Sequence, residues 1–514
     1  MKKTYLGALA LCLAGGVAYA ANPVLVDSGG SGNFTSVQAA ISSFCAGGSN
    51  AAETPPFIIN VKAGSGPYDE AITLEDQVIG KGNIVGSIEI KSDTPGVPVI
   101  FKVQPTPGAV LGTDDGLMIC QSVHNVTFRD IVFTRSLTVV PTDEIVRADE
   151  FAANNTMNTL AFYNCVFTEP TTTGDPMVTS KAGALAGPPP ARGGGALSAS
   201  PRLLQIWGDP GESVSVILNN CVFYGSTNMN CIVRLEGTLG TGVGNGNPEV
   251  LTITDSISAY AFADCYNIGG QNQAAVINVN GTNQKAGPMS ATVAWVPAHK
   301  GGTANNGHSF TLSSSGNALL DDTTKFNFNG IIAYAPADGS TNDGFSSTAA
   351  RGISGGSGWQ RVENALMLVP ALAVVDITRM PTIWDKVTIV NTTNAYYGGS
   401  ATVYPSATLT ITNSILAGTG TKISGLGLPA GGTFLTNSAV PLSGPDAATA
   451  VGAGVTETNV INDDPGFASK DGLTGAFLDV QTYAYAAAGV AGAPLAGGAD
   501  YIGAASGVND WTLY

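Results

Sequence analysis

The chain has 514 residues, and charged side chains make up only 12% of them, about half the roughly 25% of an ordinary soluble domain. The 66 glycines outnumber the 22 basic and 38 acidic residues together. This composition excludes long helices and coiled coils, which need charged outer faces, and disordered chains, which need high charge and few apolar residues. The formal net charge of −16 repels nucleic acid and anionic lipid, so we expect neither as a partner.

The first twenty residues have the order of a secretory signal. Lys2 and Lys3 precede an apolar run from Tyr5 to Val17, and the small residues Ala18-Tyr19-Ala20 follow. These are the charged, apolar and cleavage regions of a signal peptide. We therefore predict a signal peptide over residues 1–20, cleaved near Ala20, and a mature protein that is secreted, periplasmic or on the cell surface. No later stretch has the roughly 18 apolar residues of a span, so we expect no membrane insertion.

Six cysteines remain after that cleavage: Cys45, Cys120, Cys165, Cys221, Cys231 and Cys265. An even number in an oxidising compartment allows disulfides, although six is few for a chain this long. Cys165 and Cys221 follow Asn and precede Val-Phe in near-identical sequences, which favours equivalent buried positions where the thiol acts as a small apolar group. Bridges between Cys221 and Cys231, or between Cys45 and Cys120, remain open.

Short apolar strands recur with an Asn or Asp in the middle, followed by a small residue and a second strand. Asn and Asp tolerate the left-handed conformation, so a single one between two strands bends the chain sharply without ending the sheet. Stacked units of this kind predict an all-β solenoid, a parallel β-helix. An antiparallel sandwich or barrel is the alternative, but few of the hairpin turns that it needs are present. The bend residues are Asp130, Asn164, Asn220, Asp255, Asn413 and Asn437.

We predict one β-helix domain over residues 21–514. Its open first rung needs a cap, and Ser36 to Phe44 can form a short helix with Val37, Ala40 and Ile41 on one face. Pro- and Gly-rich composition predicts loop insertions at about 168–202 and 281–356, the second of which we expect to interrupt the rungs. A closing rung is expected at about 458–506.

The opening of the chain resembles pectin methylesterases. The resemblance rests on the segment 26–41, on Gly66-Pro-Tyr68-Asp-Glu70, which matches a G-x-Y-x-E element, and on Phe162 to Phe167, which matches an aromatic rung. It covers roughly residues 24–225. It implies a right-handed parallel β-helix with an N-terminal capping helix, secreted and acting on pectin-like polysaccharide.

The chain departs from that family in its catalytic motifs. The family uses two aspartates, one as nucleophile and one as acid/base. Leu204 stands where the resemblance places the nucleophile, and Phe167-Thr-Glu169-Pro lacks the acid/base element that should follow Cys165. The family's arginine motif has no clear match. The resemblance therefore implies that the family's activity is lost or replaced.

Other polar residues cluster near these positions. As acid/base candidates we name Glu144, Asp175 and Asp209, and as substrate-binding candidates Trp207, Arg147 and Arg202. Trp207 could stack on a sugar ring. We predict no resident cofactor, although clustered carboxylates could bind Ca²⁺, as they do in polysaccharide lyases of this fold. The alternative is a solvated loop with incidental charges and a tryptophan in the core.

Two functions remain open from the sequence. The first is a secreted, pectinesterase-like β-helix that binds or processes an acidic or esterified polysaccharide, and whether it is an enzyme is undecided. The second is a non-catalytic structural, adhesive or fibre-forming β-helix with self-association, which the missing aspartates favour. The fold-level likeness supports the first only by analogy.

Overall fold

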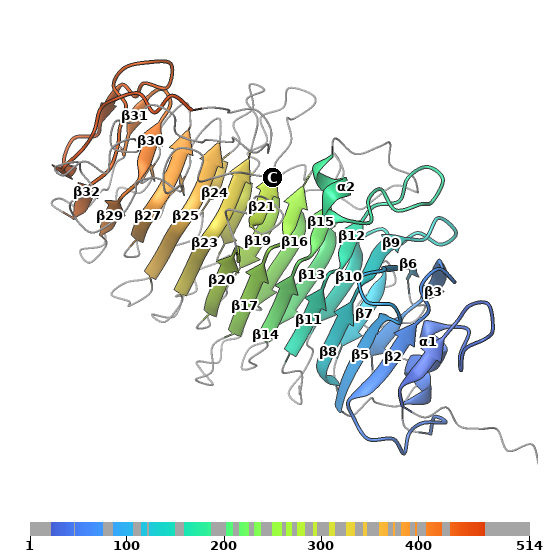
Figure 1. Cartoon of the computed structure of the whole chain (residues 1–514). Coiled ribbons are helices and arrows are strands. Elements are labelled where there is room, and N and C mark those ends of the chain that lie inside the picture. Colours follow the sequence, from blue (N-terminus) through green and yellow to red (C-terminus); the bar gives the residue numbers. More distant parts are fainter. Residues whose placement is uncertain are drawn as a thin grey trace, which may run out of the picture.

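The protein is an all-β, right-handed parallel β-helix whose strands stack along one long coil (Figure 1). The computed structural model describes residues 22–467 apart from 46, 76–85, 106–114, 121–122, 150–158, 187–201, 209–214, 226–230, 238–248, 260–263, 270–274, 283–290, 296–307, 314–324, 335–342, 347–358, 369–373, 376–381, 391–395, 398–407 and 424–431. The signal peptide predicted over 1–20 lies outside the described residues, and so does most of the predicted closing rung.

One face of the coil is a ten-stranded parallel sheet, called sheet B here, with one strand from each rung. Its strands are β4 (Thr73–Glu75), β7 (Leu117–Cys120), β10 (Glu144–Asp149), β13 (Arg202–Gly208), β16 (Cys231–Gly237), β19 (Asp264–Gly269), β22 (His308–Ser313), β24 (Asp343–Ser346), β26 (Val374–Val375) and β28 (Tyr396–Tyr397).

A 22-stranded parallel sheet, called sheet A, forms the other faces. Its strands are β1 (Val24–Val26), β2 (Phe57–Val61), β3 (Tyr68–Ala71), β5 (Gly86–Ser92), β6 (Val99–Gln104), β8 (Val123–Arg129), β9 (Ile131–Arg135), β11 (Thr159–Tyr163), β12 (Val166–Thr168), β14 (Ser215–Asn219), β15 (Val222–Tyr224), β17 (Glu249–Thr254), β18 (Ile257–Ala259), β20 (Ala275–Asn280), β21 (Thr292–Trp295), β23 (Lys325–Tyr334), β25 (Trp359–Leu368), β27 (Thr382–Val390), β29 (Leu409–Thr412), β30 (Ile415–Ala417), β32 (Thr433–Thr436) and β34 (Thr456–Thr458). Two further strands, β31 (Thr421–Lys422) and β33 (Ala450–Val451), pair with each other.

The bends between paired strands of sheet A are left-handed, as the repeat predicts. All six predicted Asn and Asp residues have a φ between 48° and 57°. Their side chains also bond from rung to rung: the Asn164 amide donates to Asp130, and the Asn220 amide donates to Asn164. Each bend residue therefore has two roles: its backbone adopts the left-handed conformation that the bend needs, and its side chain forms a hydrogen bond with the bend residue of the neighbouring rung.

Inside the coil, equivalent aromatic residues stack on each other. The ring of Phe167 lies 5.0 Å from that of Phe133 and 4.8 Å from that of Phe223, with the rings nearly parallel in both pairs. All three side chains are fully buried. Offset stacks of this kind add to the burial of apolar area, so the spacing of the aromatic rungs holds neighbouring strands in register.

The N-terminal end is closed by helix α1 (Val37–Ser43), which confirms the predicted cap. Ser36 accepts from the backbone N–H of Ala39, and the Glu70 carboxylate accepts from the N–H groups of Val37 and Gln38. The glutamate of the G-x-Y-x-E element therefore satisfies the helix N-terminus, which explains its place in the sequence.

The two predicted insertions differ in structure. Residues 168–202 hold the short helix α2 (Lys181–Leu185), which lies against the coil beside β15 (Figure 1). Residues 281–356 contribute strands β21 to β24 to the two sheets, each paired with strands of neighbouring rungs. The rungs therefore continue through a tract whose Gly- and Asn-rich composition predicts loops. Among the described residues, neither helix is long enough to cross a membrane.

Cys165 and Cys221 are buried thiols, as their matching sequences predict. Burial raises the pKa of Cys221 to about 12, so its thiol stays protonated and unreactive. Cys221 is a free thiol, so it forms no bridge with Cys231. The side chain of Cys120, which the other open pairing needs, is not among those described.

Candidate functional site

A group of charged side chains lies where three neighbouring strands of sheet B begin. Asp115 lies two residues before β7, Glu144 opens β10, and Arg202 opens β13 in register with Glu144. Gly116 joins Asp115 to β7, and a Cβ there would lie 2.4 Å from the Ile145 carbonyl oxygen. Only glycine fits this close approach, which brings Asp115 beside the next rung.

Two ion pairs hold the carboxylates of this group. Arg147 Nη1 lies 2.9 Å from Asp115 Oδ2, and Arg202 Nη1 lies 2.5 Å from Glu144 Oε1. Arg202 also donates to the side-chain oxygen of Gln205. The side chains of Asp115 and Glu144 are each 2% exposed, whereas those of Arg147 and Arg202 are 18% and 14% exposed. The carboxylates are therefore buried and the guanidinium groups reach toward the surface.

The surroundings of Glu144 favour the protonated form of its carboxyl. Burial is the largest cause and the neighbouring Asp115 acts in the same direction, while Arg202 and Arg147 oppose the shift; together they raise the pKa of Glu144 to about 8.

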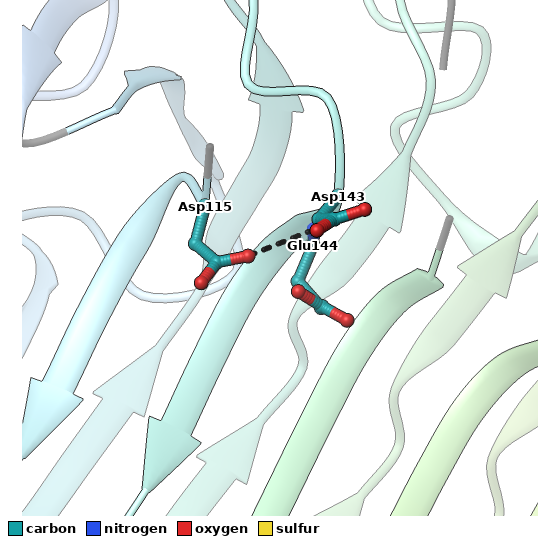
Figure 2. A group of neighbouring side chains, drawn as sticks. All are labelled: Asp115, Asp143 and Glu144. Atoms are coloured by element: carbon teal, nitrogen blue, oxygen red, sulfur yellow. Dashed lines mark hydrogen bonds between the residues drawn. The ribbon is translucent and has the colours of Figure 1, made fainter. Parts of the chain in front are cut away.

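A third carboxylate completes the group. One oxygen from each of Asp115, Asp143 and Glu144 lies within 4.8 Å of the other two, in the arrangement that Figure 2 shows. The backbone N–H of Glu144 points at Asp115 Oδ1 at 3.5 Å, the dashed line of Figure 2. Oxygen Oε2 of Glu144 is buried and has no hydrogen-bond partner among the described residues.

Arg135, at the end of β9, holds the backbone beneath this group. It is fully buried and pairs through Nε with the fully buried Glu169 at 2.9 Å. Its other nitrogens donate to the carbonyl oxygens of Pro141, Asp143 and Arg202 at 2.7, 2.6 and 3.3 Å. One side chain from sheet A thus fixes the two chain segments from which the site's carboxylates and Arg202 project.

The outer face of sheet B carries a row of polar residues in register. Arg147 pairs with Gln205, and Gln205 pairs with Arg234 on the following rung. Their neighbours on each strand, such as Val146, Leu204 and Val233, belong to the core, so alternation directs the row away from the core. Arg147 and Arg234 are partly exposed, whereas Gln205 between them is buried. We call these three residues the outer row.

The structure brings together three of the predicted site residues and separates others. Glu144, Arg147 and Arg202 form one group, as described above. Asp175 is exposed in its own turn, where it accepts from Thr173 and its N–H donates to Thr171; no described hydrogen bond or ion pair joins it to Glu144. Asp209 lies outside the described residues.

Two predictions concern the strand that carries Leu204. Trp207 lies on β13 in register with Asp149, but its side chain is not among those described, so stacking on a sugar stays a prediction. Leu204 itself is fully buried in the core. The position that the resemblance gives to the nucleophile therefore faces inward on this strand.

Sequence reasoning missed Asp115 and Arg135. Asp115 stands in Thr-Asp-Asp-Gly directly before an apolar strand; its place at a strand start was the signal available, but the register that brings it to Glu144 is not contained in the sequence. Arg135 follows Ile-Val-Phe-Thr at the end of an apolar strand, which gave no sign of a buried ion pair.

No model of a known protein family matches this chain, and no curated protein matches it in sequence. The fold and the site geometry therefore carry the functional argument.

Proposed function

We propose that this chain is a secreted, pectinesterase-like β-helix protein that binds an acidic, pectin-like polysaccharide along the outer face of sheet B. The observation that carries the proposal is the outer row, because Arg147 and Arg234 place two partly exposed guanidinium groups on the same face, with the buried Gln205 on the strand between them. Neighbouring strands lie about 4.7–4.9 Å apart, so two such groups can contact well-separated carboxylates of one extended polymer.

The charges of the site favour an acidic ligand. Guanidinium groups bind carboxylates with paired N–H donors, and each has five such donors. Arg147 and Arg202 use part of theirs on Asp115 and Glu144, and both side chains reach the surface. On a chain with a formal net charge of −16, clustered arginines on one face are the most favourable place for a polyanion.

Binding is favoured over the esterase reaction of pectin methylesterases. The residue in the nucleophile position, Leu204, is apolar and fully buried, and Asp115 and Glu144 are both nearly inaccessible. A buried pair of this kind supports the geometry of the arginines more directly than it supports attack on a large substrate.

Three polymers test whether the ligand must be acidic: polygalacturonate, highly methyl-esterified pectin and neutral dextran. In affinity electrophoresis or calorimetry we expect binding to polygalacturonate, weaker binding to the esterified pectin and none to dextran, with affinity falling as salt rises. Arg234→Gln should weaken binding about tenfold, the worth of one charge-assisted contact. The matched control is Arg361→Gln, on sheet A, where Arg361 pairs with Glu363.

Equal binding by the two variants, or no binding to any anionic polymer, would contradict the proposal and favour the structural or adhesive role. Release of methanol or of unsaturated products from pectin, measured in parallel, would instead show that the chain processes the polymer. Cell fractionation tests the expected secretion.

A further inference from the structure

We propose that Asp115, Asp143 and Glu144 form a binding site for one divalent cation, and that Ca²⁺ is the cation that fits it best. This site adjoins the outer row, because Arg147 pairs with Asp115, but it does not rest on the polysaccharide proposal, since its ligands are carboxylates and the outer row supplies N–H donors. Two separate observations support it: the convergence of three carboxylate oxygens, and a buried carboxylate oxygen without a partner.

The spacing of the oxygens selects the ion. One oxygen from each residue lies within 4.8 Å of the other two. Calcium binds oxygen at about 2.3–2.6 Å and tolerates irregular geometry, so one ion can reach ligands separated by this much. Magnesium needs oxygens at about 2.0–2.1 Å in near-ideal octahedral positions, which would require the three carboxylates to move closer.

The unpartnered oxygen shows where a ligand is needed. The residue Glu144 is 2% exposed, and its Oε2 accepts no hydrogen bond from the described residues. Leaving a buried polar atom unsatisfied costs about 1–3 kcal/mol, and more for a charged group. A cation between Glu144 and Asp115 satisfies this oxygen directly.

The two arginines leave room for the ion and limit its affinity. Arg147 takes Oδ2 of Asp115, and Arg202 takes Oε1 of Glu144. Oε2 of Glu144 therefore remains for the cation, and Oδ1 of Asp115 accepts only the long 3.5 Å bond from the Glu144 N–H. Because two positive charges already offset part of the acidic charge, we expect weak binding, with a dissociation constant of roughly 10⁻⁴–10⁻³ M, typical of extracellular calcium modules. Asp143 is partly exposed and gives the ion a ligand at the solvent side.

The test is a Ca²⁺ titration of the full chain after removal of metals by chelation. Calorimetry should show one site, and the melting temperature should rise with Ca²⁺ concentration and saturate. Mg²⁺ should bind more weakly. Asp143→Asn should weaken Ca²⁺ binding about tenfold or more, while Asp175→Asn, an exposed acidic control in a separate turn, should bind as the unmodified chain does.

Absence of Ca²⁺ binding to the unmodified chain would overturn the proposal, and so would unchanged binding by Asp143→Asn. If that variant does not fold, crystals of the unmodified protein soaked in Mn²⁺, which also takes oxygen ligands, give a second measurement. An anomalous peak among the three carboxylates supports the site, and a peak only elsewhere, or none, overturns it.

Discussion

The buried pair of Arg135 and Glu169 should be strongly coupled. Both side chains are fully buried with Nε and Oε1 2.9 Å apart. Glu169→Gln leaves the guanidinium charge without its counter-charge in the core, and breaking such a pair costs about 3–5 kcal/mol. Arg135→Met should cost at least as much, because it also removes the donors to the carbonyl oxygens of Pro141, Asp143 and Arg202.

Removing both charges together should cost much less than the two single changes added. In Arg135→Met/Glu169→Leu no charge is buried, and what remains is the loss of the carbonyl hydrogen bonds, about 1 kcal/mol each. We therefore expect a coupling free energy of at least about 2 kcal/mol, near the upper part of the usual range.

Native-state hydrogen exchange of strands β9, β10 and β13 is the appropriate assay, since a long coil opens in parts instead of all at once. The opening free energy of these strands would be compared among the two single variants, the double variant and the unmodified chain. Costs that add to within about 0.5 kcal/mol would refute the reasoning, because they would show that the two charges do not compensate each other.

Three other changes have expected outcomes. Lys386 has a φ of 56° at a bend within β27, so Lys386→Asn should raise the free energy of unfolding by about 1 kcal/mol, measured in urea; a loss would contradict the cost assigned to the left-handed backbone. Burial lowers the pKa of the fully buried Lys422 to about 7, so folding favours the neutral amine. As pH falls from the unfolded-state pKa toward 7, the unfolded chain binds a proton that the folded chain does not bind, and the free energy of unfolding decreases. Relative to the unmodified chain, Lys422→Met should therefore gain roughly 1.4 kcal/mol of stability for each pH unit between about pH 10 and 7. Thermal melts of both proteins at several pH values check this, and a difference that does not change with pH would refute it. Phe167→Ala removes a ring stacked on two neighbours and should lower the local stability by about 3–5 kcal/mol, seen as faster hydrogen exchange in β12 and β15. The control Phe434→Ala, at a partly exposed side chain, should change the exchange rates little.

The parts of the fold that could be predicted depend on local signals. A lone Asn or Asp between apolar strands marks a left-handed bend by its own chemistry, and all six predicted bends have that conformation. Lys386 and Ile423 have it too, but neither residue type signals it. Strands β21 to β24 were hidden because their apolar residues are short runs within a tract that is rich in Gly and Asn, and that composition predicts loops.

The candidate site could be predicted only in part. Glu144, Arg147 and Arg202 were named from charge clustering, and the structure joins them. Asp115 lies 29 residues before Glu144, and their contact depends on the register between rungs, which a single sequence does not contain. Asp175 is engaged within its own turn, which the sequence did not indicate, and its role in the site stays a prediction.

Rung-by-rung pairing also has a consequence for how the chain can be made. Each strand of the coil pairs with strands of adjacent rungs, so a segment emerging during synthesis or export has its partner already in place behind it. The bonds between bend residues of adjacent rungs span between 22 and 56 residues, far less than the whole chain, and loop closure of that size costs little more for a longer loop than for a shorter one. Helix α1 and its Glu70 cap would then act as the starting template, and damage to them should delay assembly of every rung that follows.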